Sequence, residues 1–140
     1  MTGTEFCVPV GDIATADVVI PTDLREWAVT PETDSAAAGA IGFATENTGA
    51  ESHELVVVRA DSIDSLPTDA DGAVDEEALS PDQELVGEVE AYPSGDACDG
   101  TFTMDPGDYV LFCNLVETGP DGTVEAHFAE GMATTFTVTE

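Results

Sequence analysis

Residues 100–113 read GTFTMDPGDYVLFC, and this stretch indicates the fold class. Its two arms are rich in β-branched and aromatic residues, which favour strands, and the residues between them, DPGD at 105–108, favour a turn. The arms have the right lengths for a β-hairpin. We therefore predict strands over 101–104 and 108–114, joined as a hairpin.

The same pattern recurs along the chain. Short strand-like runs bounded by Gly, Pro, Asn or Asp are found at 16–20, 25–29, 40–45, 54–59, 85–91 and 134–139. We therefore expect an all-β protein, an antiparallel β-sandwich of about eight strands. Residues 60–84 break this pattern, and we expect a long connection there with a short helical segment, best placed at AVDEEALS, residues 73–80.

At 140 residues the chain is long enough for one domain with a real core. We expect a single domain over 1–140, with its core at about 17–140 and an N-terminal extension at 1–16. The first ten residues lack the basic start and apolar core of a signal peptide. We expect an exported, extracytoplasmic protein whose export segment has been removed, and membrane anchoring of the full-length precursor remains an open alternative.

The charge is extreme: 30 acidic residues stand against two basic ones, giving a formal net charge of -28. Such a surface repels itself unless salt screens it, so we interpret the protein as halophilic. An acidic tail or interaction surface is the alternative, but the carboxylates are dispersed along the whole chain. Nucleic-acid binding is excluded because it needs a basic surface.

Chemistry-bearing residues are few. His53 and His127 are the only histidines, Cys113 ends a predicted strand, and Met132 follows near the C-terminus. A thiolate, two imidazoles and a thioether are the ligands of copper electron-transfer sites. Each residue taken singly is more often structural, since buried Cys and Met commonly fill a core. Their order and flanking sequences favour a shared site.

Three segments carry a resemblance to a known family. They are an N-x-G turn that leads into a strand opening with His, over 47–58, the strand GDYVLFC at 107–113, and H-x4-M at 127–132 before a closing strand. With these segments the chain resembles a cupredoxin, a blue copper protein of the plastocyanin, azurin and halocyanin type, and its acidity resembles the haloarchaeal members. The resemblance implies a Greek-key β-sandwich and one type 1 copper ion. The ligands it implies are His53, Cys113, His127 and Met132.

One departure from that family is clear. Thirteen residues separate Cys113 from His127, whereas small blue copper proteins have only a few. The insertion contains a turn signal, GPDG at 119–122, between two short runs. We therefore predict that it folds back as a hairpin and returns His127 to Cys113.

The other two cysteines, Cys7 and Cys98, lie outside the implied ligand set. A disulfide between them would pin the N-terminal segment to the domain and leave Cys113 free as a thiolate. Two unpaired thiols are the alternative, because sequence alone does not give the distance between their Cα atoms.

The favoured function is electron transfer by a monomer that has no small-molecule substrate and is not an enzyme. We expect a redox partner protein to dock near His127, at an apolar rim that includes Phe128 and Ala129 and carries Glu130 as its only carboxylate. A copper carrier or store without a redox role uses the same ligands and is the alternative function. A copper enzyme needs a second copper site, and no histidine remains for it; a metal-free adhesion domain is the last alternative.

Overall fold

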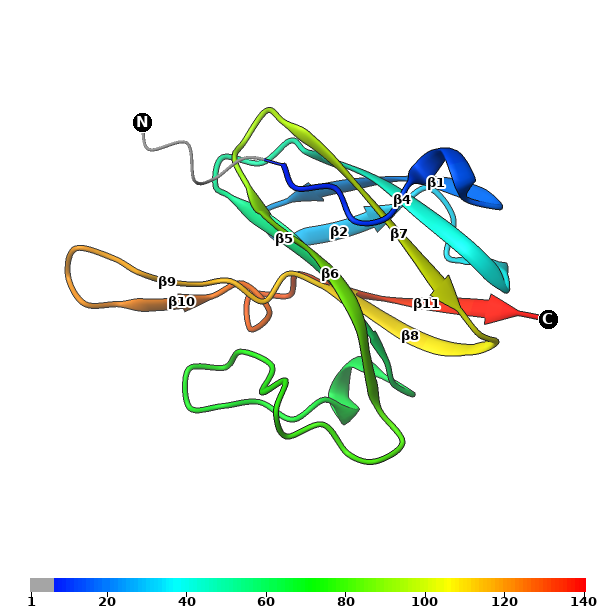
Figure 1. Cartoon of the computed structure of the whole chain (residues 1–140). Helices are drawn as coiled ribbons and strands as arrows, with labels where there is room; N and C mark the ends of the chain where they lie inside the picture. The colour runs from blue at the N-terminus through cyan, green and yellow to red at the C-terminus, as the bar shows by residue number, and fades with distance from the viewer. Residues whose placement is uncertain (1–6) are drawn as a thin grey trace.

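The computed structural model describes residues 7–140 and shows two β-sheets packed on each other (Figure 1). The first sheet has the order β2-β1-β4-β7 and consists of β1 (Val18–Arg25), β2 (Ala28–Pro31), β4 (Gly39–Asn47) and β7 (Ala97–Met104). The second has the order β3-β11-β8-β5-β6 and consists of β3 (Ser35–Ala37), β5 (His53–Arg59), β6 (Glu84–Tyr92), β8 (Gly107–Phe112) and β11 (Ala133–Thr139). A separate hairpin, β9 (Val116–Thr118) and β10 (Val124–Ala126), extends from one end of the sandwich (Figure 1).

The predicted all-β sandwich is confirmed, and its topology fits a Greek key. The described residues form eleven strands, and the eight that exceed three residues correspond to the expected number. The pairing is mixed rather than purely antiparallel, because β1 pairs with β4 and β3 pairs with β11 in parallel. After β2 the chain crosses to the second sheet, where it forms β3. It then returns to the first sheet as β4, which lies beside β1 and runs in the same direction.

The predicted hairpin over 101–114 is wrong. Strand β7 pairs with β4 in the first sheet, whereas β8 pairs with β5 and β11 in the second, so the turn between them crosses from one sheet to the other. Both arms can then direct apolar side chains into the common core. The predicted strand at 25–29 is also wrong, because β1 ends at Arg25 and β2 begins at Ala28, with a turn and a cis peptide bond at Glu26–Trp27.

The core has two parts. The main part lies between the sheets and includes Phe43, Leu111 and Phe136. The second part lies on the outer face of the second sheet, where the 60–84 connection covers it; its buried members are Val56, Val58, Ala60, Leu66, Val74, Val110 and Phe112. This cover explains why consecutive residues of β5 and β8 are buried on both faces.

The 60–84 connection contains a short helical segment, as predicted, but at a different place. It is the 3-10 turn η2 (Ile63–Ser65), and residues 73–80 form turns instead of a helix. Val74 is held in an isolated bridge to Thr68, and the Asn114 side chain binds its backbone N–H and C=O at 2.8 and 3.0 Å. Among residues 7–140 the only other helical element is η1 (Ile13–Thr15), and no helix there is long and apolar enough to cross a membrane.

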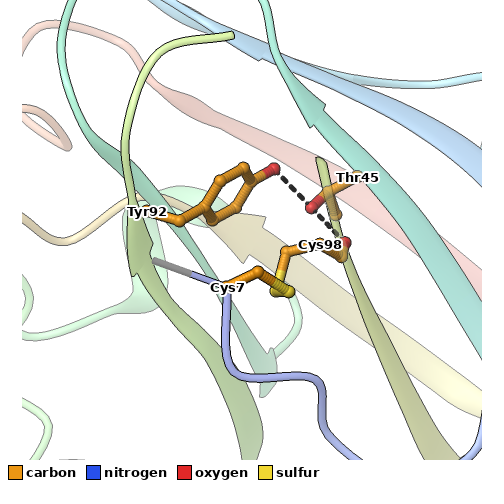
Figure 2. The surroundings of a disulfide bond; sticks show 4 residues. All are labelled: Cys7, Thr45, Tyr92 and Cys98. Carbon is orange, nitrogen blue, oxygen red and sulfur yellow. Dashed lines mark hydrogen bonds between the residues drawn. A yellow bond between two sulfur atoms is a disulfide. The ribbon is translucent and has the colours of Figure 1, made fainter. Parts of the chain in front are cut away.

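The disulfide between Cys7 and Cys98 is present (Figure 2), with the two Cα atoms 5.3 Å apart. Cys98 lies within β7 rather than in a loop, and its carbonyl accepts a 2.6 Å hydrogen bond from the Thr45 hydroxyl. That hydroxyl also lies 2.6 Å from the Tyr92 hydroxyl. The bond fastens the N-terminal segment to β7, and Val10 continues the attachment through a bridge to Gly100. The segment before residue 7, which belongs to the expected 1–16 extension, lies outside the described residues.

Candidate metal centre

Three residues far apart in the sequence meet at one end of the sandwich. His53 begins β5, Cys113 directly follows β8, and His127 directly follows β10. The Nδ1 atoms of His53 and His127 lie 3.8 and 3.4 Å from the Cys113 sulfur. All three side chains are fully buried, and their potential ligand atoms lie within 4.8 Å of one another.

These spacings fit a single metal ion of three-fold geometry. With metal–sulfur and metal–nitrogen bonds of about 2.3 and 2.0 Å, an angle of about 120° at the metal separates sulfur from nitrogen by about 3.7 Å. The two observed sulfur–nitrogen distances, 3.4 and 3.8 Å, lie on either side of that value. One soft sulfur with two imidazole nitrogens is also the donor set that suits copper. The residues present therefore fit the copper ion that the resemblance implies.

Met132 is brought to the same place by a tight turn over 127–131. Its backbone N–H donates to the His127 carbonyl at 3.2 Å, and its own carbonyl accepts from the Cys113 N–H at 3.1 Å. Gly131 adopts a positive φ of 109° in this turn, a conformation that favours glycine. The Met132 side chain is fully buried in the cluster that contains Cys113. Its role as an axial ligand remains a prediction.

The long insertion between Cys113 and His127 folds as predicted. Its β9 and β10 pair in antiparallel register, with Val116 opposite Ala126 and Thr118 opposite Val124. The hairpin closes at its base, where the His127 N–H donates to the Leu115 carbonyl at 2.9 Å. A thirteen-residue insertion therefore returns His127 to within 3.4 Å of the Cys113 sulfur.

The Cys113 side chain is fully buried. Burial raises the pKa of its thiol to about 12, although backbone N–H groups of Glu54 and Leu115 act in the opposite direction. The Glu54 N–H lies 3.4 Å from the sulfur. A metal ion is the agent that would deprotonate such a thiol, because a coordinating thiol loses its proton outright. Hydrogen bonding and burial around the sulfur are also the features that tune the potential of copper–thiolate sites.

His53 is oriented by a carboxylate that sequence reasoning missed. Oε2 of Glu26 lies 2.7 Å from His53 Nε2, on the side of the ring opposite Cys113. Burial opposes ionisation of Glu26, but hydrogen bonds from the Ala50 and Glu51 N–H groups lower its pKa to about 2. Burial lowers the pKa of His53 and so favours a neutral ring, although the neighbouring Glu26 carboxylate acts in the opposite direction.

The N-x-G turn fixes the loop next to the Glu26–His53 pair. The buried Asn47 amide donates to the carbonyls of Glu51 and Tyr92 at 2.9 and 3.1 Å, and its oxygen accepts from the Gly49 N–H at 3.0 Å. These bonds fix the loop that carries Glu51 and leads into His53. The turn was recognised in the sequence, but nothing there indicated Glu26, which is one of 30 acidic residues.

His127 does not have the expected surroundings. It is fully buried rather than exposed at an apolar rim, and Trp27 contacts it edge-on with ring centroids 5.0 Å apart. Carboxylate oxygens of Glu117 and Glu51 lie 3.1 and 3.3 Å from its Nε2. The expectation of a rim without carboxylates apart from Glu130 is therefore wrong, because the insertion hairpin and the N-x-G loop carry acidic side chains to the outer edge of the ring.

An open hollow of about 390 Å³ lies beyond these carboxylates and is lined by Glu51, Glu117, Thr118, Gly119, Thr123 and Glu125. A hydrogen bond with Glu117 and burial raise the pKa of Glu51. The outer edge of His127 thus faces solvent through a layer of acidic side chains. No local sequence pattern indicated this layer, since its members come from the N-x-G loop and from both strands of the insertion hairpin.

Comparisons with known proteins place the fold. No model of a known protein family and no curated protein sequence matches the chain. Among solved structures, auracyanin B is similar over 96% of this chain and 97% of its own, with 18% identity and a TM-score of 0.61. Rusticyanin from Thiobacillus ferrooxidans is similar over 89% and 79%, with 12% identity and a TM-score of 0.59.

A third structure is auracyanin A, described as a "blue" copper protein from Chloroflexus aurantiacus; it is similar over 85% of this chain and 99% of its own, with 15% identity and a TM-score of 0.51. These neighbours are cupredoxins, so the chain has the cupredoxin fold. At these identities the likeness concerns the fold, and the chemistry rests on the residues described above.

Proposed function

We propose that the protein is a type 1 copper protein that carries single electrons, with His53, Cys113, His127 and Met132 as its ligands. The observation that carries this proposal is the position of two imidazole Nδ1 atoms at 3.4 and 3.8 Å from one buried thiol. Copper would supply the redox couple. The chain's own residues bind it, hold the imidazoles in place and keep water away.

The scaffold supports this role. His53 begins β5, Cys113 follows β8 and Met132 precedes β11, and these three strands belong to the packed second sheet. His127 follows β10 of the insertion hairpin, which a hydrogen bond to the Leu115 carbonyl closes at its base. The site therefore rests on stiff elements and should change little in shape when its charge changes. Copper in such a site needs little rearrangement between its two oxidation states, which suits electron transfer. The similar fold of auracyanin A, a "blue" copper protein, agrees with this proposal.

Electron transfer requires a partner, and we place its docking near His127. Because that ring is covered by Glu51 and Glu117, the partner would approach through an acidic layer rather than an apolar rim. The disulfide between Cys7 and Cys98 is typical of an oxidising compartment and supports an exported, extracytoplasmic protein.

Titration of the metal-free protein with copper tests the proposal. We expect one ion per chain and an intense visible band from charge transfer between the Cys113 sulfur and Cu(II). Cys113→Ser should abolish the band, since a hydroxyl is neither soft nor readily ionised. Uptake of copper by the wild type without this band would contradict the role of Cys113 and the electron-transfer function with it.

A copper carrier or store without a redox role is the second candidate, because it would use the same ligands. The two functions differ in reversibility. A carrier of electrons should cycle between Cu(II) and Cu(I) without losing metal to a modest chelator, whereas a store should release it.

A further inference from the structure

We infer that Glu26 is a positioning residue for the copper site, which holds His53 in one tautomer and places a negative charge behind it that favours Cu(II). This inference rests on the proposed function and concerns a residue outside the ligand set. Glu26 follows β1 in the sequence, 27 positions before His53. It acts through His53 and would not itself touch the metal.

The contacts of Glu26 are those of a fixed group. Its Oε1 accepts from the Ala50 N–H at 2.8 Å, and its Oε2 accepts from the Glu51 N–H at 2.9 Å. The same Oε2 lies 2.7 Å from His53 Nε2, so one carboxylate joins the turn after β1 to the loop before β5. With the His53 side chain fully buried, no solvent competes for this nitrogen.

These contacts determine the tautomer of His53. An ionised carboxylate can only accept hydrogen bonds, so the proton between the two groups belongs to His53 Nε2. In a neutral imidazole the other nitrogen then carries the lone pair. That nitrogen, Nδ1, is the one that faces the Cys113 sulfur at 3.8 Å. Glu26 therefore presents the correct nitrogen for metal binding before any metal arrives.

The charge has a second effect. A carboxylate that accepts from a ligating histidine makes the ring a stronger donor, and removing such a partner typically costs 10–100-fold in metal affinity. The stronger donor stabilises the doubly charged ion more than the singly charged one. Glu26 should therefore lower the reduction potential of the site.

Two variants separate the positioning effect of Glu26 from the effect of its charge. Glu26→Gln keeps an oxygen for the His53 N–H but removes the charge, and Glu26→Leu removes both. The matched control is Glu84→Gln, which makes the same change in net charge at an exposed position opposite Arg59, on the order of 20 Å from His53 along β5. Each variant is loaded with copper and its potential is measured by redox titration.

We expect Glu26→Gln to weaken Cu(II) binding relative to Cu(I) about tenfold, which corresponds to a rise in potential of about 59 mV for one electron. Glu84→Gln should change the potential by less than a third of that amount. Equal potentials in the wild type and Glu26→Gln would overturn the electronic part of the inference.

A measurement on the metal-free protein tests the positioning directly. Two-dimensional ¹H–¹⁵N spectra of the histidine rings should show His53 protonated at Nε2 in the wild type and in Glu26→Gln, and a mixture of tautomers in Glu26→Leu. A proton on Nδ1 of His53 in the wild type would overturn the inference. Because this measurement needs no copper, it decides the role of Glu26 even if the copper titration contradicts the proposed function.

Discussion

Gly49 packs directly against the carboxylate of Glu26. A Cβ atom at position 49 would lie 2.7 and 2.8 Å from the two carboxylate oxygens and 2.8 Å from His53 Nε2, closer than carbon approaches these atoms. The glycine of the N-x-G turn is therefore required for close approach rather than for an unusual backbone angle. This contact explains why the turn before His53 contains a residue without a side chain.

Gly49→Ala should disturb the site and the fold together. The added methyl group must displace Glu26 or His53, and overpacking of this kind costs about 1–3 kcal/mol in the free energy of unfolding. We expect about tenfold weaker copper binding, comparable to the loss of a partner of a ligating histidine. Denaturant unfolding and copper titration check the two effects.

Gly119→Ala is the matched control for that variant. At position 119 the nearest atom to an added Cβ is an oxygen of the exposed Asp121 side chain at 3.2 Å, and this side chain can move. We expect its stability and copper affinity to stay close to the wild type. Equal effects of the two substitutions would contradict the special role of Gly49.

Met132→Leu tests the axial position. Leucine fills a similar volume but offers no sulfur, so we expect the visible band to persist while the reduction potential rises, because the axial bond is the weakest of the four. Met104→Leu is the control, since Met104 is equally buried in the main core but lies in β7. If Met132→Leu leaves both spectrum and potential unchanged, another group occupies the axial position.

The sequence predicted the cluster of His53, Cys113 and His127 better than it predicted the surroundings of that cluster. His53, Cys113 and His127 were recognisable because the chain contains only two histidines and three cysteines, and the cysteine left outside the disulfide is the one beside both rings. Glu26 was not recognisable, because acidic residues are everywhere and its contact with His53 depends on how two loops meet across the sandwich.

The local features of the fold were likewise predicted better than its long-range contacts. Strand positions follow from local residue preferences, and most predicted runs match the observed strands to within a few residues. The partners of a strand depend on tertiary packing, which is why DPGD was assigned to a hairpin although it joins two sheets. Likewise the exposure of His127 depended on where the insertion hairpin carried Glu117, a contact that no local pattern encodes.

Tyr92 should make stability depend on alkaline pH. Burial raises the pKa of its phenol from 10.0 to about 12, although the hydrogen bond with Thr45 acts in the opposite direction. The folded state therefore holds the proton more tightly than the unfolded state. The corresponding stabilisation is complete below pH 10 and is lost as pH rises through about 12, and its full size is on the order of 2–3 kcal/mol.

Denaturant unfolding of the metal-free protein at several pH values between 9 and 12 measures this loss. Tyr92→Phe should lower the stability at pH 9 by about 1 kcal/mol, because the hydrogen bond with Thr45 is gone. It should also flatten the decline at higher pH, since phenylalanine has no proton to lose. A decline of the same steepness in both proteins would show that Tyr92 is not its cause.

Salt should stabilise the protein strongly. The net charge of -28 is spread over a surface of 7024 Å², which leaves neighbouring net charges about 16 Å apart. In water without salt such neighbours repel by about 0.3 kcal/mol per pair. The screening length is about 10 Å at 0.1 M salt and about 3 Å at 1 M, so repulsion between neighbours persists at the first concentration and vanishes at the second.

Summed over a few neighbours per charge, this difference amounts to a few kcal/mol, and we expect the melting temperature to rise on the order of 10 °C between 0.1 and 1 M KCl. Thermal unfolding followed by circular dichroism checks the value. The rise should level off by about 1 M, because screening between neighbours is then complete. A melting temperature that stays constant over this range would contradict the halophilic interpretation, and a rise that continues undiminished above 1 M would indicate strengthened burial of apolar groups instead of charge screening.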